Sequence, residues 1–169
     1  MQRAGRVVWR GLSLRARVGG DAAAGGDAAA EPAWSIAMPD VYSIRHTTVE
    51  DHVEPVAHEI KVRRADLLSD LRNADKRAAY LGMAGECWYV LAAGIAEPDE
   101  VPADCGVLLA HGDDFAELEL ARPAPARAMP FEAGLPFAVW MALARGTPAP
   151  WPDEPTQRWL GEPTDDPPA

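Results

Sequence analysis

Two short segments carry the residue types that metal-assisted phosphate chemistry requires. Asp40 follows Pro39, and Glu59 and Lys61 stand two positions apart in the run Glu59-Ile60-Lys61. Two neighbouring carboxylates hold a hard divalent cation through oxygen ligands and leave room for water and a substrate phosphate. The metal stabilises charge on the phosphoryl group, and an adjacent lysine orients the attacking water or stabilises the developing charge. Asp40, Glu59 and Lys61 are therefore the candidate catalytic residues, with Asp40 and Glu59 as ligands of Mg²⁺ or Mn²⁺.

A strand is the element that must position two of these side chains. Residues 56–62 alternate in character, so Glu59 and Lys61 project from the same face of a strand. The other face carries Val56, His58, Ile60 and Val62, and we expect that face to point inward, with His58 as a hydrogen-bonded core histidine. Asp40 lies where Pro39 interrupts the preceding strand candidate, residues 33–45. If the two strands pair, all three groups converge.

The remaining elements predict an α/β class with a mixed sheet flanked by helices in a single domain. Period-two alternation predicts a strand over residues 6–18, and short apolar runs predict strands near 88–91, 106–110 and 115–120. One amphipathic helix is expected over residues 66–82, and another between Pro136 and Gly146. The domain spans residues 1–146, including a flexible Gly/Ala-rich loop at 19–32, and residues 147–169 form a Pro-rich acidic tail expected to be disordered.

Charge restricts how the protein can meet a nucleic acid. The chain has 169 residues and a net charge of −10, which argues against a binder that uses its whole surface. Residues 1–20 nevertheless carry five arginines and no acid. A second basic stretch, residues 61–77, supplies the candidate nucleic-acid-binding side chains, although a solvated helix face explains such a run equally well. These candidates are Arg63, Arg64, Lys76 and Arg77, with Arg72 beside them.

Other broad classes are excluded by composition. No run approaches the roughly 20 apolar residues of a membrane span, and no apolar signal-peptide region is present. The two cysteines, Cys87 and Cys105, have no metal-site spacing and build no disulfide framework. The expectation is a cytoplasmic protein without a membrane partner, whose oligomeric state is open and includes a homodimer.

The motif order resembles a known family. Pro39-Asp40, then Glu59-Ile60-Lys61 on the next strand, then a helix is similar to the pattern of the PD-(D/E)XK nuclease superfamily, with its restriction-endonuclease-like fold. The stretch from Glu59 through Asp70, Lys76, Tyr80 and Trp88-Tyr89 looks particularly like its bacterial DNA-repair members called MmcB. The resemblance covers about residues 36–110. It implies DNA as substrate, Asp40 and Glu59 as metal ligands and Lys61 as the catalytic lysine.

One departure from the family leaves two functions open. The family core has a helix before its first strand, often with another acidic residue, whereas residues 1–20 open on the strand Val7-Val8-Trp9 and hold no acid. The leading expectation is a metal-dependent endonuclease or exonuclease that hydrolyses DNA phosphodiester bonds, in repair. The alternative is a catalytically inactive DNA-binding or protein-interaction module that retains the fold. A third carboxylate beside Asp40 and Glu59 would favour catalysis.

Overall fold

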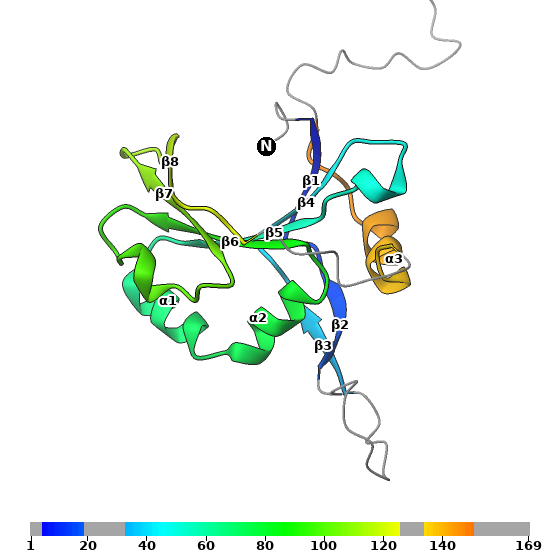
Figure 1. Ribbon diagram of the computed structural model, residues 1–169, viewed down its shortest axis with the longest axis horizontal. Helices are drawn as coiled ribbons and strands as arrows, with labels where there is room; N and C mark the ends of the chain where they lie inside the picture. The colour runs from blue at the N-terminus through cyan, green and yellow to red at the C-terminus, as the bar shows by residue number, and fades with distance from the viewer. Residues whose placement is uncertain (1–4, 19–32, 126–133, 151–169) are drawn as a thin grey trace, which may run out of the picture.

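A computed structural model describes residues 5–18, 33–125 and 134–150 of the chain (Figure 1). The expected flexible loop at 19–32 and residues 151–169 of the expected tail lie outside these ranges. Within them, no helix is long and apolar enough to cross a membrane.

A six-stranded mixed sheet organises the domain. Its strands in spatial order are β1 (Arg6–Arg10), β4 (Val41–Arg45), β5 (Val56–Lys61), β6 (Glu86–Ala92), β7 (Gly106–His111) and β8 (Glu117–Arg122). Strand β4 is antiparallel to both β1 and β5, the strands β5, β6 and β7 are parallel to one another, and β8 is antiparallel to β7. With its helices, this sheet confirms the expected α/β class, a mixed sheet flanked by helices.

The first two strand candidates are each split into two strands. Gly11, at a φ of +57°, ends β1 and starts a bend into β2 (Leu14–Val18), so the single strand predicted over residues 6–18 is wrong. The predicted interruption at Pro39 is confirmed, between β3 (Ala33–Ala37) and β4. The two bends lie side by side, because the Gly11 N–H donates to the Asp40 carbonyl at 3.0 Å. Strands β2 and β3 therefore leave the main sheet together as a separate two-stranded sheet.

The single helix expected over residues 66–82 is also divided, into α1 (Arg64–Leu71) and α2 (Ala74–Leu81). Asn73 causes the division, because its side-chain oxygen accepts the Lys76 backbone N–H at 3.1 Å and caps a new helix. The predicted stop at Gly82 is confirmed. The predicted continuous apolar stripe is wrong, because Leu67 is buried whereas Leu68, expected on the same stripe, is 40% exposed.

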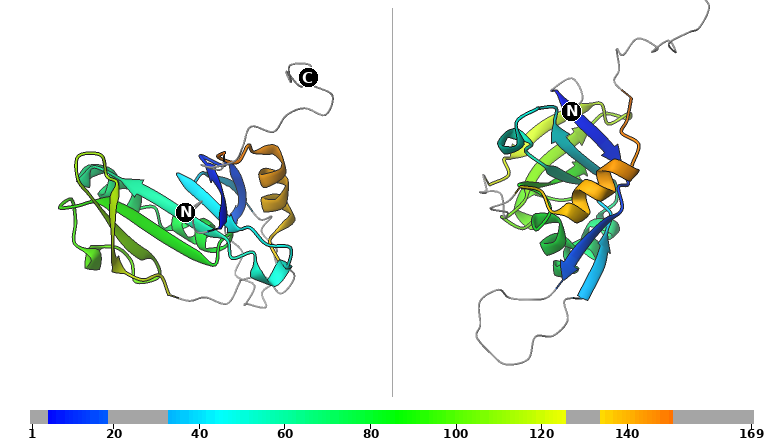
Figure 2. Two further views of the ribbon diagram at one scale, coloured as in Figure 1. Left: turned by 90° about the horizontal axis from the view of Figure 1, so that it is seen from above. Right: turned by 90° about the vertical axis from the view of Figure 1, so that its right-hand side faces the viewer.

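The last helix, α3 (Phe137–Arg145), lies between Pro136 and Gly146 as the sequence predicts. Figure 2 shows it beside β1 and β2, and its Val139 and Leu143 join the core there. The chain then runs back along β1, where the Ala149 N–H donates to the Val8 carbonyl at 2.7 Å. Residues 147–150, assigned from the sequence to the tail, thus lie against the sheet.

The face of β5 that points inward differs from the expectation. Helices α1 and α2 lie together on one side of the sheet (Figure 1), and they cover the face that carries Ala57 and Glu59. Ile60 and Val62, expected to be inward, are 45% and 50% exposed, while Val56 and His58 on their face are buried. The expected inward face is therefore wrong at this end of β5. Glu59 is instead buried between the sheet and α2.

Candidate active site

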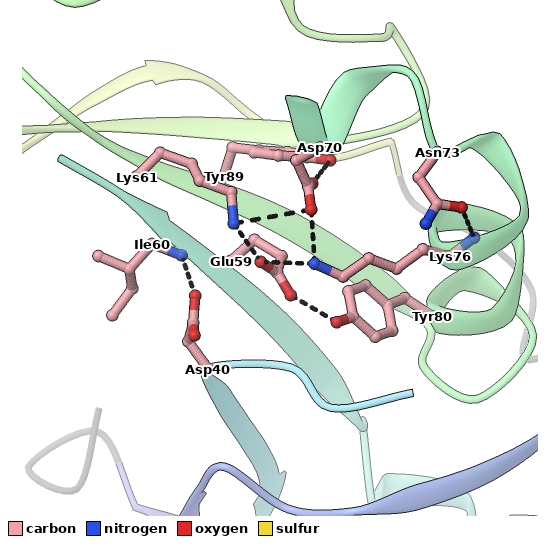
Figure 3. A network of polar contacts seen from close by, with 9 residues as sticks. All are labelled: Asp40, Glu59, Ile60, Lys61, Asp70, Asn73, Lys76, Tyr80 and Tyr89. Carbon is pink, nitrogen blue, oxygen red and sulfur yellow. Dashed lines mark hydrogen bonds and ion pairs between the residues drawn. The ribbon is translucent and has the colours of Figure 1, made fainter. Parts of the chain in front are cut away.

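Glu59 is held by three hydrogen-bond donors in a buried position. Its side chain is only 2% exposed. The Tyr80 hydroxyl donates to Oε1 at 2.5 Å, while Lys61 Nζ lies 2.6 Å and Lys76 Nζ 3.1 Å from Oε2 (Figure 3). Both carboxylate oxygens are therefore satisfied by side chains, which offsets the cost of burying the charge.

A second carboxylate shares the same two lysines. Asp70 Oδ1 lies 2.5 Å from Lys76 Nζ and 3.7 Å from Lys61 Nζ, and its Oδ2 accepts a hydrogen bond of 2.8 Å from the Tyr89 hydroxyl. Two carboxylates and two ammonium groups balance in charge. We call these six residues the Glu59–Asp70 network: Glu59, Lys61, Asp70, Lys76, Tyr80 and Tyr89.

The division between α1 and α2 brings this network together. Asp70 comes from the end of α1, and the cap at Asn73 turns the chain so that α2 returns toward the sheet. Lys76 and Tyr80 are four residues apart on α2 and so lie on one face of the helix. The Lys76 Nζ also stands 5.4 Å from the centre of the Tyr80 ring. A continuous helix over residues 66–82 would not give this arrangement.

The protonation states of the network follow from its contacts. Burial alone would raise the pKa of Asp70, but hydrogen bonds from Lys76 and Tyr89 outweigh it and hold that pKa below its ordinary value. Burial lowers the pKa of Lys76, and its contacts with Asp70 and Glu59 more than compensate and raise it. Burial and the neighbouring carboxylates raise the pKa of Tyr80 and Tyr89. Lys76 is therefore charged at neutral pH, and the two tyrosines are neutral donors.

Asp40 lies next to this network, immediately before the neighbouring strand β4. Val41 pairs with His58 across β4 and β5, so Asp40 comes one position further, beside Glu59 and Ile60. Its Oδ2 accepts the Ile60 N–H at 2.7 Å (Figure 3), and the residue is exposed. The structure thus brings Asp40, Glu59 and Lys61 to one end of the β4–β5 pair, as the sequence predicts.

The carboxylate oxygens of Asp40 and Glu59, at one end of the β4–β5 pair, suit a hard cation, although these two residues lack a third ligand beside them. Among the described residues, no group of three or more His, Cys, Asp or Glu side chains could hold a metal ion. Two carboxylates nevertheless stand at one end of two adjacent strands, and Oε2 of Glu59 already accommodates two ammonium groups within 3.1 Å. These ammonium groups occupy the oxygen that a divalent ion would use. A divalent ion would have to replace one of the lysine contacts.

The predicted nucleic-acid-binding side chains are mostly engaged in ion pairs. Arg64 makes a bidentate pair with Glu100, at 3.0 and 2.7 Å, and this contact lowers the pKa of Glu100 to about 2. Arg77 lies 3.7 Å from Asp104, and Lys76 belongs to the network. Arg63 is exposed and makes no ion pair with a described residue. Of the four predicted side chains, only Arg63 is thus left without an ion pair to a described residue.

Four members of the network were not predicted as members of the site. Asp70, Tyr80 and Tyr89 received no role from the sequence, and Lys76 was expected to contact phosphate. The sequence does hold one signal that sets Lys76 apart from the arginines around it. Lys61 and Lys76 are the only two lysines in the chain, whereas the other 14 of its 16 Lys and Arg residues are arginines. A lysine ammonium is a compact point charge that can bridge two carboxylates, whereas a guanidinium favours bidentate pairs.

Comparisons with known proteins add little to this geometry. No family model matches the chain, and no curated protein matches it. Among solved structures it is similar to the "SPO1766 protein of unknown function from Silicibacter pomeroyi". The two are 19% identical, the match covers 76% of this chain and 66% of that chain, and the TM-score is 0.48. The case for a function therefore depends on the residues of this chain.

Proposed function

We propose that the protein is a divalent-metal-dependent deoxyribonuclease that hydrolyses phosphodiester bonds at Asp40, Glu59 and Lys61. One observation carries the proposal. The pairing of β4 with β5 sets Asp40 against the Ile60 N–H at 2.7 Å, between the two residues Glu59 and Lys61 that share a face. An exposed carboxylate, a buried carboxylate and a lysine at one strand end are what phosphate hydrolysis with a hard cation requires.

Asp40 and Glu59 would hold Mg²⁺ or Mn²⁺, which supplies a Lewis acid for the phosphate and a more acidic bound water. The chain itself supplies the positioning. The Tyr80 hydroxyl fixes the orientation of Glu59, and the Ile60 N–H fixes that of Asp40. Both restraints come from regular secondary structure, so the carboxylates need little rearrangement to act as ligands.

Lys61 and Lys76 would have different roles in the reaction. Lys61 projects beside Glu59, where its charge can orient water or stabilise the charge that develops on the phosphate oxygens. Lys76 has Asp70 as a closer partner, at 2.5 Å against 3.1 Å for Glu59. It can therefore withdraw from Glu59 while it keeps its ion pair with Asp70, and Glu59 Oε2 becomes available. The setting that the family resemblance implies is DNA repair, and the composition predicts a cytoplasmic protein.

A second candidate function is a DNA-binding or protein-interaction module without catalysis. The observation that favours it is the saturation of Glu59, whose two oxygens already have three donors. Asp70 is a third carboxylate beside Glu59, but it is held by Lys76 and Tyr89, and the described residues form no group of three His, Cys, Asp or Glu side chains that could hold a metal ion. In this reading the Glu59–Asp70 network is a structural element, and metal ions leave it unchanged.

Cleavage of labelled DNA tests the proposal. The full chain is incubated with end-labelled single-stranded, duplex and flap oligonucleotides in Mg²⁺ or Mn²⁺, with chelator as the blank. The proposal expects metal-dependent products that Asp40→Asn and Glu59→Gln abolish. The matched controls are Asp113→Asn and Glu117→Gln, two exposed acids near the β7–β8 turn, which should cleave normally. No cleavage of any substrate by the parent protein would favour the second candidate.

A further inference from the structure

We infer that an arginine-lined hollow between the β1–β2 bend and α3 binds the phosphate backbone of DNA. This inference takes its ligand from the proposed function, but the site is separate from the Glu59–Asp70 network. We call it the arginine hollow. It consists of two adjoining depressions of about 350 and 260 Å³ that share Ser13, Ala142 and Arg145, with Arg10 lining the larger and Arg15 the smaller.

The charge of the arginine hollow is one-sided. Arg10, Arg15 and Arg145 are exposed, and among the residues that the structure describes no acidic side chain lines either depression. None of the three makes an ion pair with a residue that the structure describes, in contrast to Arg64 and Arg77 on the helices. In a chain of 26 acidic and 16 basic residues, this concentrates positive potential in one place. Local potential of this kind attracts phosphates even when the net charge is negative.

The chemistry and shape of the hollow favour an extended polyanion. Guanidinium groups donate paired hydrogen bonds that match phosphate oxygens. The hydroxyl-bearing residues Ser13 and Thr147 also line the larger depression and add short polar donors. The three arginines line two adjoining depressions, an arrangement that suits several linked phosphates better than one small anion. A nucleic-acid strand carries a phosphate at every nucleotide.

The position of the hollow connects it to the proposed catalytic residues. Gly11 lines the larger depression, and its N–H donates to the Asp40 carbonyl at 3.0 Å. The bend that forms one wall of the hollow is therefore bonded directly to the residue proposed as a metal ligand. Figure 2 shows α3, which forms the other wall, beside β1 and β2.

Salt-dependent binding of a fluorescent duplex to the full chain tests the inference. Anisotropy is measured in chelator, so that no cleavage occurs, over a series of NaCl concentrations. The test variant is Arg10→Gln/Arg145→Gln. The matched control is Arg45→Gln/Arg72→Gln, which removes the same charge from the end of β4 and from the residue that follows α1, outside the hollow. For two lost phosphate contacts, the slope of log K against log salt should become shallower by about 1.8 in the test variant. The control should keep the parent slope.

Folding and ligand type have their own controls. Arg145 is in the last turn of α3, where a cation favours the helix end, so circular dichroism of the test variant is compared with the parent. If that variant unfolds, Arg10→Gln/Arg15→Gln, which leaves α3 intact, replaces it with the same expected slope change. Inorganic phosphate should displace the duplex no better than chloride at equal ionic strength. Specific displacement by phosphate would mean that the hollow holds a single anion, and would overturn the inference.

The outcomes separate this inference from the proposed function. If the hollow variant loses DNA binding while the parent never cleaves DNA with any metal, the inference stands and the nuclease proposal fails. If the parent cleaves DNA and only the control variant loses binding, the nuclease proposal stands and the inference is overturned. A parent chain that binds no duplex at low salt also overturns it.

Discussion

Replacing Lys76 by methionine removes the ammonium group that bridges the two carboxylates of the network. Methionine keeps much of the apolar stem. The Lys76 Nζ contacts Asp70 at 2.5 Å and Glu59 at 3.1 Å, and hydrogen bonds to charged partners contribute about 1.5–3 kcal/mol each. Two features reduce the cost: the Lys76 side chain is 28% exposed, and Lys61 remains 2.6 Å from Glu59. We expect a loss of about 2–3 kcal/mol in unfolding free energy, below the ~3–5 kcal/mol of a fully stranded buried charge.

Urea denaturation at pH 7 measures this loss, and a double-mutant cycle assigns it. In Lys76→Met/Asp70→Asn one charge of each sign is gone, so the double variant should lose less than the sum of the two single variants, by about 1 kcal/mol or more. A loss under about 0.5 kcal/mol in Lys76→Met is the behaviour of an ordinary surface substitution. That result would refute the reasoning that Lys76 is part of a buried network.

The same variant also bears on the metal. If Lys76 competes with a divalent cation for Glu59 Oε2, its removal should tighten Mn²⁺ binding, as measured by calorimetry in the absence of DNA. An unchanged or weaker affinity would contradict the competition that we assign to Lys76.

Three further predictions concern two supports of the site, Tyr80 and Asn73, and the buried His58 of β5. Tyr80→Phe leaves Glu59 Oε1 buried without its donor and should cost about 1–3 kcal/mol in urea denaturation; no loss would mean that water replaces the hydroxyl. Asn73→Ala removes the cap of α2 and should cost about 1 kcal/mol, with reduced amide-exchange protection in α2 as the second readout; unchanged protection would contradict the role of the cap. Burial, followed by the charge of Arg6, lowers the pKa of His58 to about 3, so below about pH 6.5 the unfolded chain takes up a proton that the folded one does not. The free energy of unfolding should therefore decrease as the pH is lowered from about 6.5 to 3, by up to about 1.4 kcal/mol per pH unit. His58→Leu should make this pH dependence weaker, as measured by urea denaturation across that range. A pH dependence equal to the parent's would contradict the role of His58.

The parts of the structure that the sequence predicted depend on local rules. Proline cannot continue a ladder, so the break at Pro39 was visible, and strand alternation alone put Glu59 and Lys61 on one face. Pro136 and Gly146 marked the two ends of α3 by the same kind of local preference.

The parts that it missed depend on contacts between distant residues. Which face of β5 is inward was decided by α1 and α2, which cover Glu59 and leave Ile60 exposed. The ion pairs of Arg64 and Arg77 form with Glu100 and Asp104, at sequence separations that no local pattern reveals. The asparagine cap at Asn73 was a local signal, but the apolar spacing across it favoured one helix.

The arginine hollow also depends on contacts between residues that are distant in the sequence. Its walls come from residues 9–15 and 138–147, which are far apart in the chain. The run of arginines near the N-terminus was visible as composition, yet only the packing of α3 against β2 brings Arg145 beside them.

The central claim is that Lys61 acts in catalysis beside Asp40 and Glu59, and single-turnover cleavage of DNA by Lys61→Met tests it most directly. Lys76 still neutralises Glu59 in this variant, so we expect folded protein that binds DNA nearly as the parent does. With Mg²⁺ and saturating protein, the cleavage rate should fall on the order of 10²–10³-fold, the effect of losing one preorganised charge at the reacting phosphate. Undiminished cleavage by folded Lys61→Met, or a parent chain without metal-dependent cleavage, would contradict the claim.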